Sequence, residues 1–314
     1  MGQRANLIIL QNNRYELYYS HWCANTLPHD LFWGEQYAIP YIRMQTRVNE
    51  SDWLDDVWAE GGVVVDLDQK TMLLYGGEDI VYDIPLRNLF LRLMSAMWKG
   101  WVIKWAFEGI ATMADYVGYP RENVVAPRKE DSVDCSIAPP EEKSWTDLIV
   151  SVKFSAEEML IFPVSGEVEP CLLNGEGLIS RIDKVYGYRT LHTAEWSKRF
   201  PAGGLHIDRT EKRLAYWDSY VRVRNNTRIQ SRWPGWEIVN FESDYESHAQ
   251  LTEGRLHFHI ADERHLLKEI ETILLREPSN PLDRIVNPNA FHFNGFELPK
   301  VVKEELLTYA ISQL

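Results

Sequence analysis

Four polar side chains near the N-terminus have the residue types that bind an anion or move a proton. They are Arg4, Asn6, Tyr19 and His21. A guanidinium holds a carboxylate or phosphate through two parallel hydrogen bonds, and an imidazole exchanges protons near neutral pH. Arg4, Tyr19 and His21 are therefore candidate catalytic residues, with Asn6 and Trp22 as binding residues. The alternative is structural: Arg4 and Asn6 satisfy backbone groups, while Tyr19 and Trp22 pack.

These side chains come together only if a hairpin joins the two segments that carry them. Residues Ala5–Leu10 and Tyr15–Tyr19 have the composition of strands. Asn12 and Asn13 lie between them, and such a pair favours a tight turn. Pairing about this turn brings the outer ends of both strands side by side. The sequence thus predicts that the four polar side chains converge at the open end of an N-terminal hairpin.

Three histidines near the C-terminal third are the only residues that suggest a metal. In a strand, His257 and His259 would share one face, with His265 a few residues on. The nearby carboxylates, Asp262 and Glu263, fit the start of a helix better than a metal site. We therefore predict an exposed strand face, and neither a metal nor another cofactor.

An acidic stretch supplies further candidate binding residues. Asp52, Asp55 and Asp56 lie between residues 49 and 83, where ten acidic residues and one basic residue occur, a net charge of −9. Carboxylates at this density attract a basic partner. The alternative is an ordinary solvated face.

A basic stretch contrasts with it. Arg222, Arg224 and Arg228 lie between residues 201 and 235, where seven basic and three acidic residues give a net charge of +4. Arginines in this number suit a phosphate or an acidic partner. The alternative is that they pair internally with the acidic stretch.

A fifteen-residue pattern occurs twice in the chain. Gly61–Tyr75 reads GGVVVDLDQKTMLLY and Gly203–Trp217 reads GGLHIDRTEKRLAYW, without a gap between them in alignment. The motif W-x-G-W follows each copy and ends at Trp101 and at Trp236. Because tryptophan is rare, we expect two copies of one unit, with both tryptophans buried on equivalent strands.

The paired glycines do not belong to a known catalytic or phosphate-binding motif. The P-loop and dinucleotide signatures are missing, as are the serine-hydrolase, zinc-protease and kinase signatures. We predict that each Gly-Gly reverses the chain. Asp66 and Asp208 are expected to hold turns through side-chain-to-backbone hydrogen bonds.

The repeat predicts an α+β fold made by internal tandem duplication. Each unit is expected to run β-β, helices, β-β-α-β-α, with C-terminal helices packed on the pair. The predicted divisions are a first unit at 1–120, a proline-rich charged linker at 121–144, a second unit at 145–260 and a helical extension at 261–314.

Caps and apolar periodicity predict the individual helices. Ser51 precedes acidic residues in the way that a helix N-terminus requires, and the apolar residues from 86 to 97 recur at helical spacing. Helices are expected at residues 34–46, 51–58, 86–97, 262–276 and 301–313, with a turn-rich stretch at 278–299.

Composition narrows the class of function. The net charge of −13 argues against general nucleic-acid binding, which depends on neutralising phosphates. Twelve tryptophans and fifteen tyrosines supply the side chains that dominate binding hot spots. The apolar runs are too short for a membrane span. Cys23, Cys135 and Cys171 are widely spaced and include no C-x-x-C, so they suit a reducing cytoplasm and argue against a disulfide scaffold or a zinc knuckle.

Together these features favour a non-enzymatic cytoplasmic binding protein that recognises a basic macromolecular partner. An antagonist of a basic toxin, of the immunity or antitoxin type, is the concrete form of this hypothesis. The alternative is an enzyme that acts on a small phosphate- or carboxylate-bearing substrate between the two units. A structural protein that uses the repeat only for stability is a third class.

Overall fold

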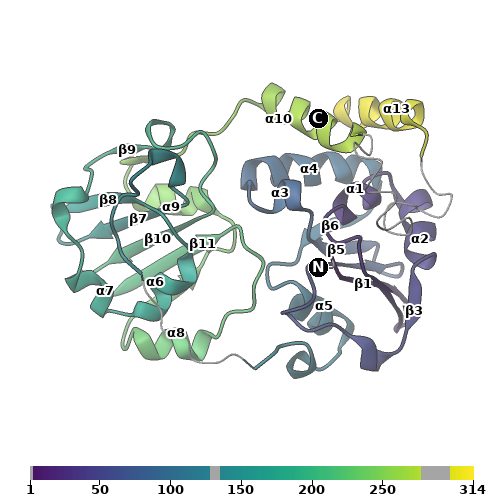
Figure 1. Ribbon diagram of the computed structural model, residues 1–314, viewed down its shortest axis with the longest axis horizontal. Coiled ribbons are helices and arrows are strands. Elements are labelled where there is room, and N and C mark those ends of the chain that lie inside the picture. Colours follow the sequence, from purple (N-terminus) through teal and green to yellow (C-terminus); the bar gives the residue numbers. More distant parts are fainter. Residues whose placement is uncertain (1–2, 128–134, 277–297) are drawn as a thin grey trace.

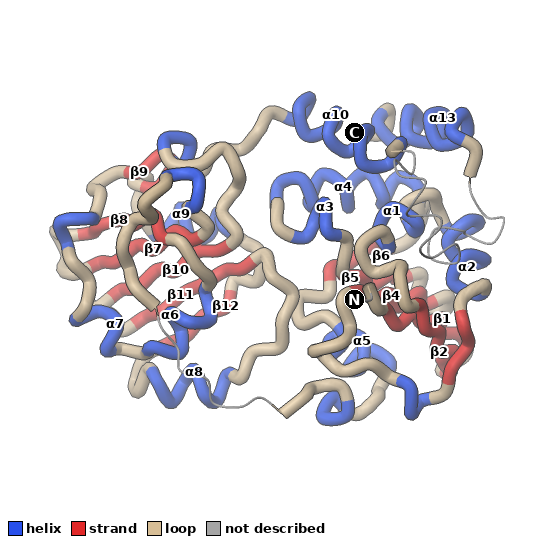
Figure 2. Tube along the Cα trace, viewed as in Figure 1, coloured by secondary structure: helices blue, strands red, loops and turns tan. Residues whose placement is uncertain are grey.

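Two α/β units lie side by side in the computed structural model, which describes residues 3–127, 135–276 and 298–314. Each is built around a mixed β-sheet, as Figures 1 and 2 show. We call the six-stranded sheet with its surrounding helices the first unit, and the five-stranded sheet with its helices the second unit. The predicted α+β class with a duplicated sheet is confirmed. The expected turn-rich stretch at 278–299 lies almost wholly outside the described residues.

The two sheets have the same strand order. The first is ordered β3-β2-β1-β4-β5-β6, and the second is ordered β8-β7-β10-β11-β12, so only β3 lacks a counterpart. In both, the first strand runs parallel to the strand that begins with Gly-Gly. The strands are β1 Ala5–Gln11, β2 Arg14–Ser20, β3 Thr46–Val48, β4 Gly61–Asp66, β5 Thr71–Tyr75, β6 Val102–Trp105, β7 Leu148–Lys153, β8 Met159–Val164, β10 Gly203–Asp208, β11 Arg213–Asp218 and β12 Glu237–Asn240. A small parallel pair, β9 Leu191–His192 and β13 Leu256–His257, lies beside the second sheet.

Helices cover both faces of each sheet. They are α1 Leu27–Leu31, α2 Glu35–Arg43, α3 Glu78–Val81, α4 Ile84–Met97, α5 Ile110–Val117, α6 Val168–Asn174, α7 Gly177–Ser180, α8 Asn226–Arg232, α9 Tyr245–Leu251, α10 Glu263–Leu275 and α13 Lys300–Ile311. A Cβ on Gly203 would meet Val168 of α6, whereas one on Gly204 would meet His248 of α9. Neighbouring strand residues point to opposite faces, so α6 and α9 lie on opposite sides of the second sheet. The C-terminal α10 and α13 pack on α4 (Figure 1).

The turns predicted at Asn12–Asn13, Asp66 and Asp208 form, but the chain reversal predicted at each Gly-Gly is wrong. These glycines are the first residues of β4 and β10 and lack positive φ. Asn12 and Asn13 have φ angles of 53° and 55°, which a two-residue type I′ hairpin requires. Oδ1 of Asp66 accepts hydrogen bonds from the backbone N–H groups of residues 68 and 69. Asp208 does the same for residues 210 and 211. Both aspartates therefore stabilise turns rather than face a substrate.

A pair of tryptophans anchors each unit in the same way. The indole N–H of Trp98 donates to the carbonyl of Leu31 at 2.8 Å, and that of Trp233 donates to the carbonyl of Leu172 at 2.7 Å. Each indole meets the second tryptophan of its motif edge to face, with ring centroids 4.8 Å and 5.0 Å apart. The second tryptophans are 7% and 5% exposed. The predicted burial of Trp101 and Trp236 is thus confirmed.

The helix predicted at residues 51–58 is wrong. Only a 3-10 turn forms, at Glu50–Asp52. Side chains compete for the backbone here: Asp52 accepts the N–H of residue 49, and Oδ1 of Asp55 accepts the N–H groups of residues 57 and 58. Asn6 of β1 takes the N–H of Leu54 at 2.8 Å. These bonds hold the segment in an irregular path. The helix expected at 34–46 is real but shorter, as α2.

The spacing of the cysteines argued against disulfides, and this expectation is wrong for two of the three. Cys135 and Cys171 form a disulfide, with Cα atoms 5.4 Å apart. They are 36 residues apart in the chain, and folding brings α6 beside the segment that precedes the second unit's first strand. Cys23 is free and buried. The predicted cytoplasmic location therefore loses the support of the cysteines. Within the described ranges, no helix is long and apolar enough to cross a membrane.

Replacing either buried anchor by alanine should destabilise the fold. Trp101→Ala and Trp236→Ala should each lower the free energy of unfolding by about 3–5 kcal/mol, because each leaves a large cavity. Urea unfolding followed by circular dichroism measures the loss. Trp145 is 53% exposed, so Trp145→Ala should change the free energy of unfolding by no more than about 0.5 kcal/mol. Equal effects for all three variants would contradict the anchoring role.

Candidate binding cleft between the two units

The predicted N-terminal cluster forms only in part. The hairpin does bring its ends together, with Asn6 opposite Tyr19. Asn6 is fully buried, and its amide bonds the backbone of Leu54 and of Tyr18. It therefore has the structural role that was the alternative. The hydroxyl of Tyr19 lies 2.8 Å from Nδ1 of His21.

The remaining members of that cluster separate. The guanidinium of Arg4 stacks on the ring of Trp58, 4.6 Å from its centroid. Arg4 and Tyr19 line a hollow of about 500 Å³ together with Val48, Asp52, Trp53, Leu54 and Trp58. His21 and Trp22 do not line this hollow, and their rings contact each other at 4.6 Å. The anion-binding and proton-transfer groups thus do not face one cavity.

The basic residues are largely neutralised within the second unit. Arg222 forms ion pairs with Glu167 at 2.7 Å and with Glu169 at 2.9 Å. Arg224 pairs with Asp218 in a buried contact. Arg228 lies in the first turn of α8, half-buried, with its backbone N–H capped by Asn225. Arg222 and Arg224 therefore pair with acids of their own unit rather than with the acidic stretch of the other.

A cavity of about 350 Å³ opens where the units meet. Its walls come from segments far apart in the chain: Asp56–Glu60 and Tyr75–Tyr82 of the first unit, the start of α5, and Tyr220–Val223 of the second unit. The lining residues are Asn25, Asp56, Ala59, Glu60, Tyr75, Gly76, Gly77, Glu78, Val81, Tyr82, Glu108, Gly109, Ile110, Tyr220, Val221, Arg222 and Val223. We call this cavity the inter-unit cleft.

The lining of the inter-unit cleft is acidic. Asp56, Glu60, Glu78 and Glu108 face a single arginine, Arg222, whose charge is already matched. Partial desolvation and the Glu108 carboxylate raise the pKa of Glu242, which lies beside the cleft. Desolvation is the larger cause of this pKa shift, and the negative charge of Glu108 adds to it because a nearby like charge disfavours ionisation.

Three of the cleft carboxylates, Glu60, Glu78 and Glu108, are held in place by a hydrogen bond or an ion pair. Glu78 accepts from the amide of Asn25 at 2.9 Å, and Glu60 accepts from the backbone N–H of Arg4 at 3.0 Å. Glu108 pairs with Arg121 at 2.5 Å. A carboxylate accepts about four hydrogen bonds, so one or two fixed bonds orient each group without exhausting it. The site is pre-organised for a ligand that donates hydrogen bonds.

Tyrosines form the other part of the lining. The rings of Tyr82 and Tyr220, one from each unit, meet edge to face at 5.1 Å. Tyr82 is 49% exposed, so this pair lies at the mouth. Tyr75 is buried behind them and donates its hydroxyl to the carbonyl of Ala59 at 3.4 Å. Aromatic faces beside carboxylates provide the environment that organic cations prefer.

A buried arginine joins the two units behind the cleft. Arg87 of α4 is 1% exposed, and its Nη1 donates to the carbonyl of Val81 at 2.9 Å and to that of Ser219 at 3.3 Å. The guanidinium also lies 4.6 Å from the ring centroid of Trp105. Burial lowers the pKa of Arg87 to about 10, so the group stays charged at neutral pH. This contact fixes the distance between the cleft walls.

Sequence reasoning identified Asp56 and Arg222 but missed most of the cleft. Glu60 and Glu78 entered only as charges of the acidic stretch 49–83, Glu108 lies outside that stretch, and Tyr220 has no motif around it. The available signal was glycine: residues 76, 77 and 109 all have positive φ and bend the chain around the cavity. Comparison with protein-family models, with curated proteins and with solved structures finds no match to this chain.

Substitution of Gly109 should disturb the contact between the units. Its φ is +56°, and a Cβ there would lie 2.9 Å from Cγ1 of Val221. Gly118 also has positive φ, at +74°, but a Cβ there meets nothing. Gly118→Ala should cost about 1 kcal/mol, because its backbone is left-handed helical. Gly109→Ala should cost at least about 1 kcal/mol more, because its ψ of −126° lies outside that region and because the Cβ adds a clash. Thermal unfolding measures both, and equal losses would contradict this expectation.

Proposed function

We propose that this chain is a non-enzymatic binding protein that recognises a basic macromolecular partner, as an immunity- or antitoxin-type antagonist of a basic toxin would. The observation that carries the proposal is the inter-unit cleft, where four carboxylates and three tyrosines surround one arginine that is already paired. A cationic side chain gains both charge attraction and aromatic contact there.

The surface beside the cleft supports the same proposal. Asp52, Asp55 and Asp56 belong to the irregular segment that separates the cleft from the hollow at Arg4. Val57 and Trp58 of this segment are 60% and 53% exposed. An exposed tryptophan flanked by carboxylates has the composition of a protein-binding hot spot.

The enzyme alternative receives less support. An anionic substrate would meet four carboxylates in the inter-unit cleft, and like charges in a partly desolvated site repel. Arg4, Tyr19 and His21, the candidate catalytic residues, do not line it. If an activity exists at this cluster, His21→Ala should abolish turnover, whereas the same change should leave the affinity for a basic partner unaltered.

Isosteric neutralisation of the cleft should weaken binding of a cationic peptide. We expect an octa-arginine peptide to bind the wild-type protein, and an octa-citrulline peptide of the same size to bind much more weakly. Glu60→Gln combined with Glu78→Gln should reduce the affinity at least about tenfold, because two favourable charge contacts are lost. Isothermal titration calorimetry measures both peptides.

The matched control for this experiment is Glu271→Gln. Glu271 is exposed on α10 and is not a cleft residue. Removing its charge should therefore leave the affinity for octa-arginine within about twofold of the wild-type value. If citrulline and arginine peptides bind equally, or if both variants behave alike, the proposal fails.

The acidic segment should act mainly on the rate of association. Asp52, Asp55 and Asp56 also accept backbone hydrogen bonds, so asparagine is preferred to lysine as the replacement. The triple Asp→Asn variant should bind octa-arginine with a lower association rate constant at low salt. The difference should shrink towards 0.1 M salt, where the screening length falls to about 10 Å. Stopped-flow fluorescence measures the rates; a salt-independent difference would indicate a structural defect instead.

A further inference from the structure

One buried polar cluster distinguishes the second unit from the first. In the first sheet, Ile8 of β1 is the parallel partner of Val64 of β4. At the same register in the second sheet, Ser151 of β7 is the partner of His206 of β10. Ser151 and His206 are 0% and 3% exposed. The same position in one fold is therefore apolar in one unit and polar in the other.

The covering helices and third strands differ in the same way. A Cβ on Gly62 would meet the sulfur of Met113 on α5 and the ring of Tyr75. A Cβ on the matching Gly204 would meet His248 on α9 and Trp217. Since Ile8, Val64 and Met113 fill this layer in the first unit, the fold does not require two buried histidines and a serine in the second.

The hydrogen bonds of this cluster fix the proton of His248 and leave the Ser151 hydroxyl two acceptors. Nε1–H of Trp217 can only donate, and it lies 3.0 Å from Nδ1 of His248, so that nitrogen is the acceptor. The proton of His248 is then on Nε2, which donates to Oγ of Ser151 at 2.7 Å. The serine hydroxyl lies 2.8 Å from Nδ1 of His206 and 3.5 Å from the carbonyl of Leu205. Donation over the shorter distance leaves both histidines neutral, with the proton on Nε2.

The two histidines differ in how they tolerate a second proton. If Nδ1 of His206 gains one, the serine hydroxyl can rotate toward the carbonyl of Leu205, 3.5 Å away, and accept from both rings. If Nδ1 of His248 gains one, it faces the indole N–H of Trp217, and two donors then oppose each other at 3.0 Å. His248 is thus the position where protonation breaks the chain.

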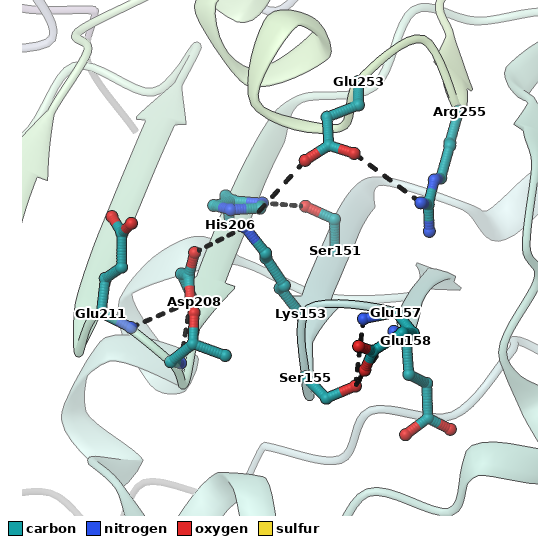
Figure 3. A network of polar contacts seen from close by, with 11 residues as sticks. Ser151, Lys153, Ser155, Glu157, Glu158, His206, Asp208, Glu211, Glu253 and Arg255 are labelled. Carbon is teal, nitrogen blue, oxygen red and sulfur yellow. Dashed lines mark hydrogen bonds and ion pairs between the residues drawn. The ribbon is translucent and has the colours of Figure 1, made fainter.

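The charges around the cluster do not offset the cost of protonating His248. Figure 3 shows Lys153 between Asp208 and Glu253, beside the Ser151–His206 pair. Near His206, Asp208 favours a proton, whereas Lys153 and Arg213 oppose it. His248 meets Trp217, Phe258 and His206, and of these His206 also opposes its charge. No carboxylate contacts the His248 ring among the bonds described for α9, β7, β10 and β11.

Burial moves both titrations in the same direction. It lowers the pKa of His206 to about 4 and that of His248 to about 3, against about 6.5 in an unfolded chain. The stability that the cluster contributes is therefore complete above pH 6.5. It decreases as the pH falls from 6.5 toward 4, because the open state takes up protons that the closed state excludes.

The helix that carries His248 also takes part in the contact between the units. α9 packs on β10 and β11. Trp217 and Tyr245 of the second unit form a small apolar cluster with Ile84, the first residue of α4. Movement of α9 would disturb this cluster.

We propose that Ser151, His206 and His248 form an acid-sensitive latch, in which proton uptake by His248 breaks its bond with Trp217 of β11 and releases α9 from the second sheet. The inference is independent of the partner proposed above. The equivalent α5 of the first unit, with Met113 in place of the histidine, has no such response.

Hydrogen exchange of the whole protein at pH 7 and pH 5 tests the latch. After correction for intrinsic exchange rates, protection of the α9 amides should fall at least about 20-fold in the wild type, the effect of one histidine that titrates only when exposed. Protection of the α5 amides should not change, which makes them an internal control. In His248→Met the α9 response should be at least about tenfold smaller than in the wild type, because only His206 can then titrate on opening. His265→Met, at an exposed histidine, should keep the full response.

A second measurement does not depend on a variant that folds. Nitrogen-15 NMR of the histidine rings should find both buried rings in the Nε2–H form at pH 7. An Nδ1–H form of His248, or titration of His248 near pH 6.5 in the intact fold, would overturn the proposal. So would an equal loss of protection in α9 and α5.

Discussion

One hydrogen bond, made once in each unit, determines how the helices sit on the sheets. The buried indoles of Trp98 and Trp233 donate to carbonyls of α1 and α6, and a buried donor without an acceptor costs about 1–3 kcal/mol. The need to keep this hydrogen bond therefore restricts where α1 or α6 can lie relative to the tryptophan. The glycine that follows that helix, Gly34 or Gly175, lies against the carbonyl at the end of the same tryptophan-bearing helix, where a side chain would not fit. This contact holds the helix against the sheet in both units, and the walls of the inter-unit cleft belong to these packed units.

Features that depend on local chemistry were predictable from the sequence. Asn12 and Asn13 tolerate positive φ, so the hairpin turn followed from residue type alone. The repeated Gly-Gly, Asp and Lys pattern predicted two equivalent hairpins, because a turn stabilised by its own aspartate needs no distant partner. Local reasoning failed at residues 51–58, where a buried asparagine from β1 takes a backbone N–H that a helix would use.

The candidate site was less predictable, because its residues come from five separate segments. Asp56 and Arg222 were identified from charge density, but nothing near Tyr220 in the chain indicates that it meets Tyr82. The Arg4 cluster shows the opposite problem. Pairing of the two strands brings the members of this cluster to one end of a hairpin. The direction of each side chain then decides which cavity it faces. The Cys135–Cys171 disulfide likewise depends on a tertiary approach over 36 residues.

The buried Arg87 has a consequence for how the duplication persisted. A newly duplicated gene encodes two copies that can each fold alone, and either can be lost. Here a cation from α4 of the first copy donates to the carbonyl of Ser219 in the second. A first copy on its own would lose this acceptor for a guanidinium that is buried in the intact chain. The two copies are thereby coupled in folding, and neither can be deleted without loss to the other.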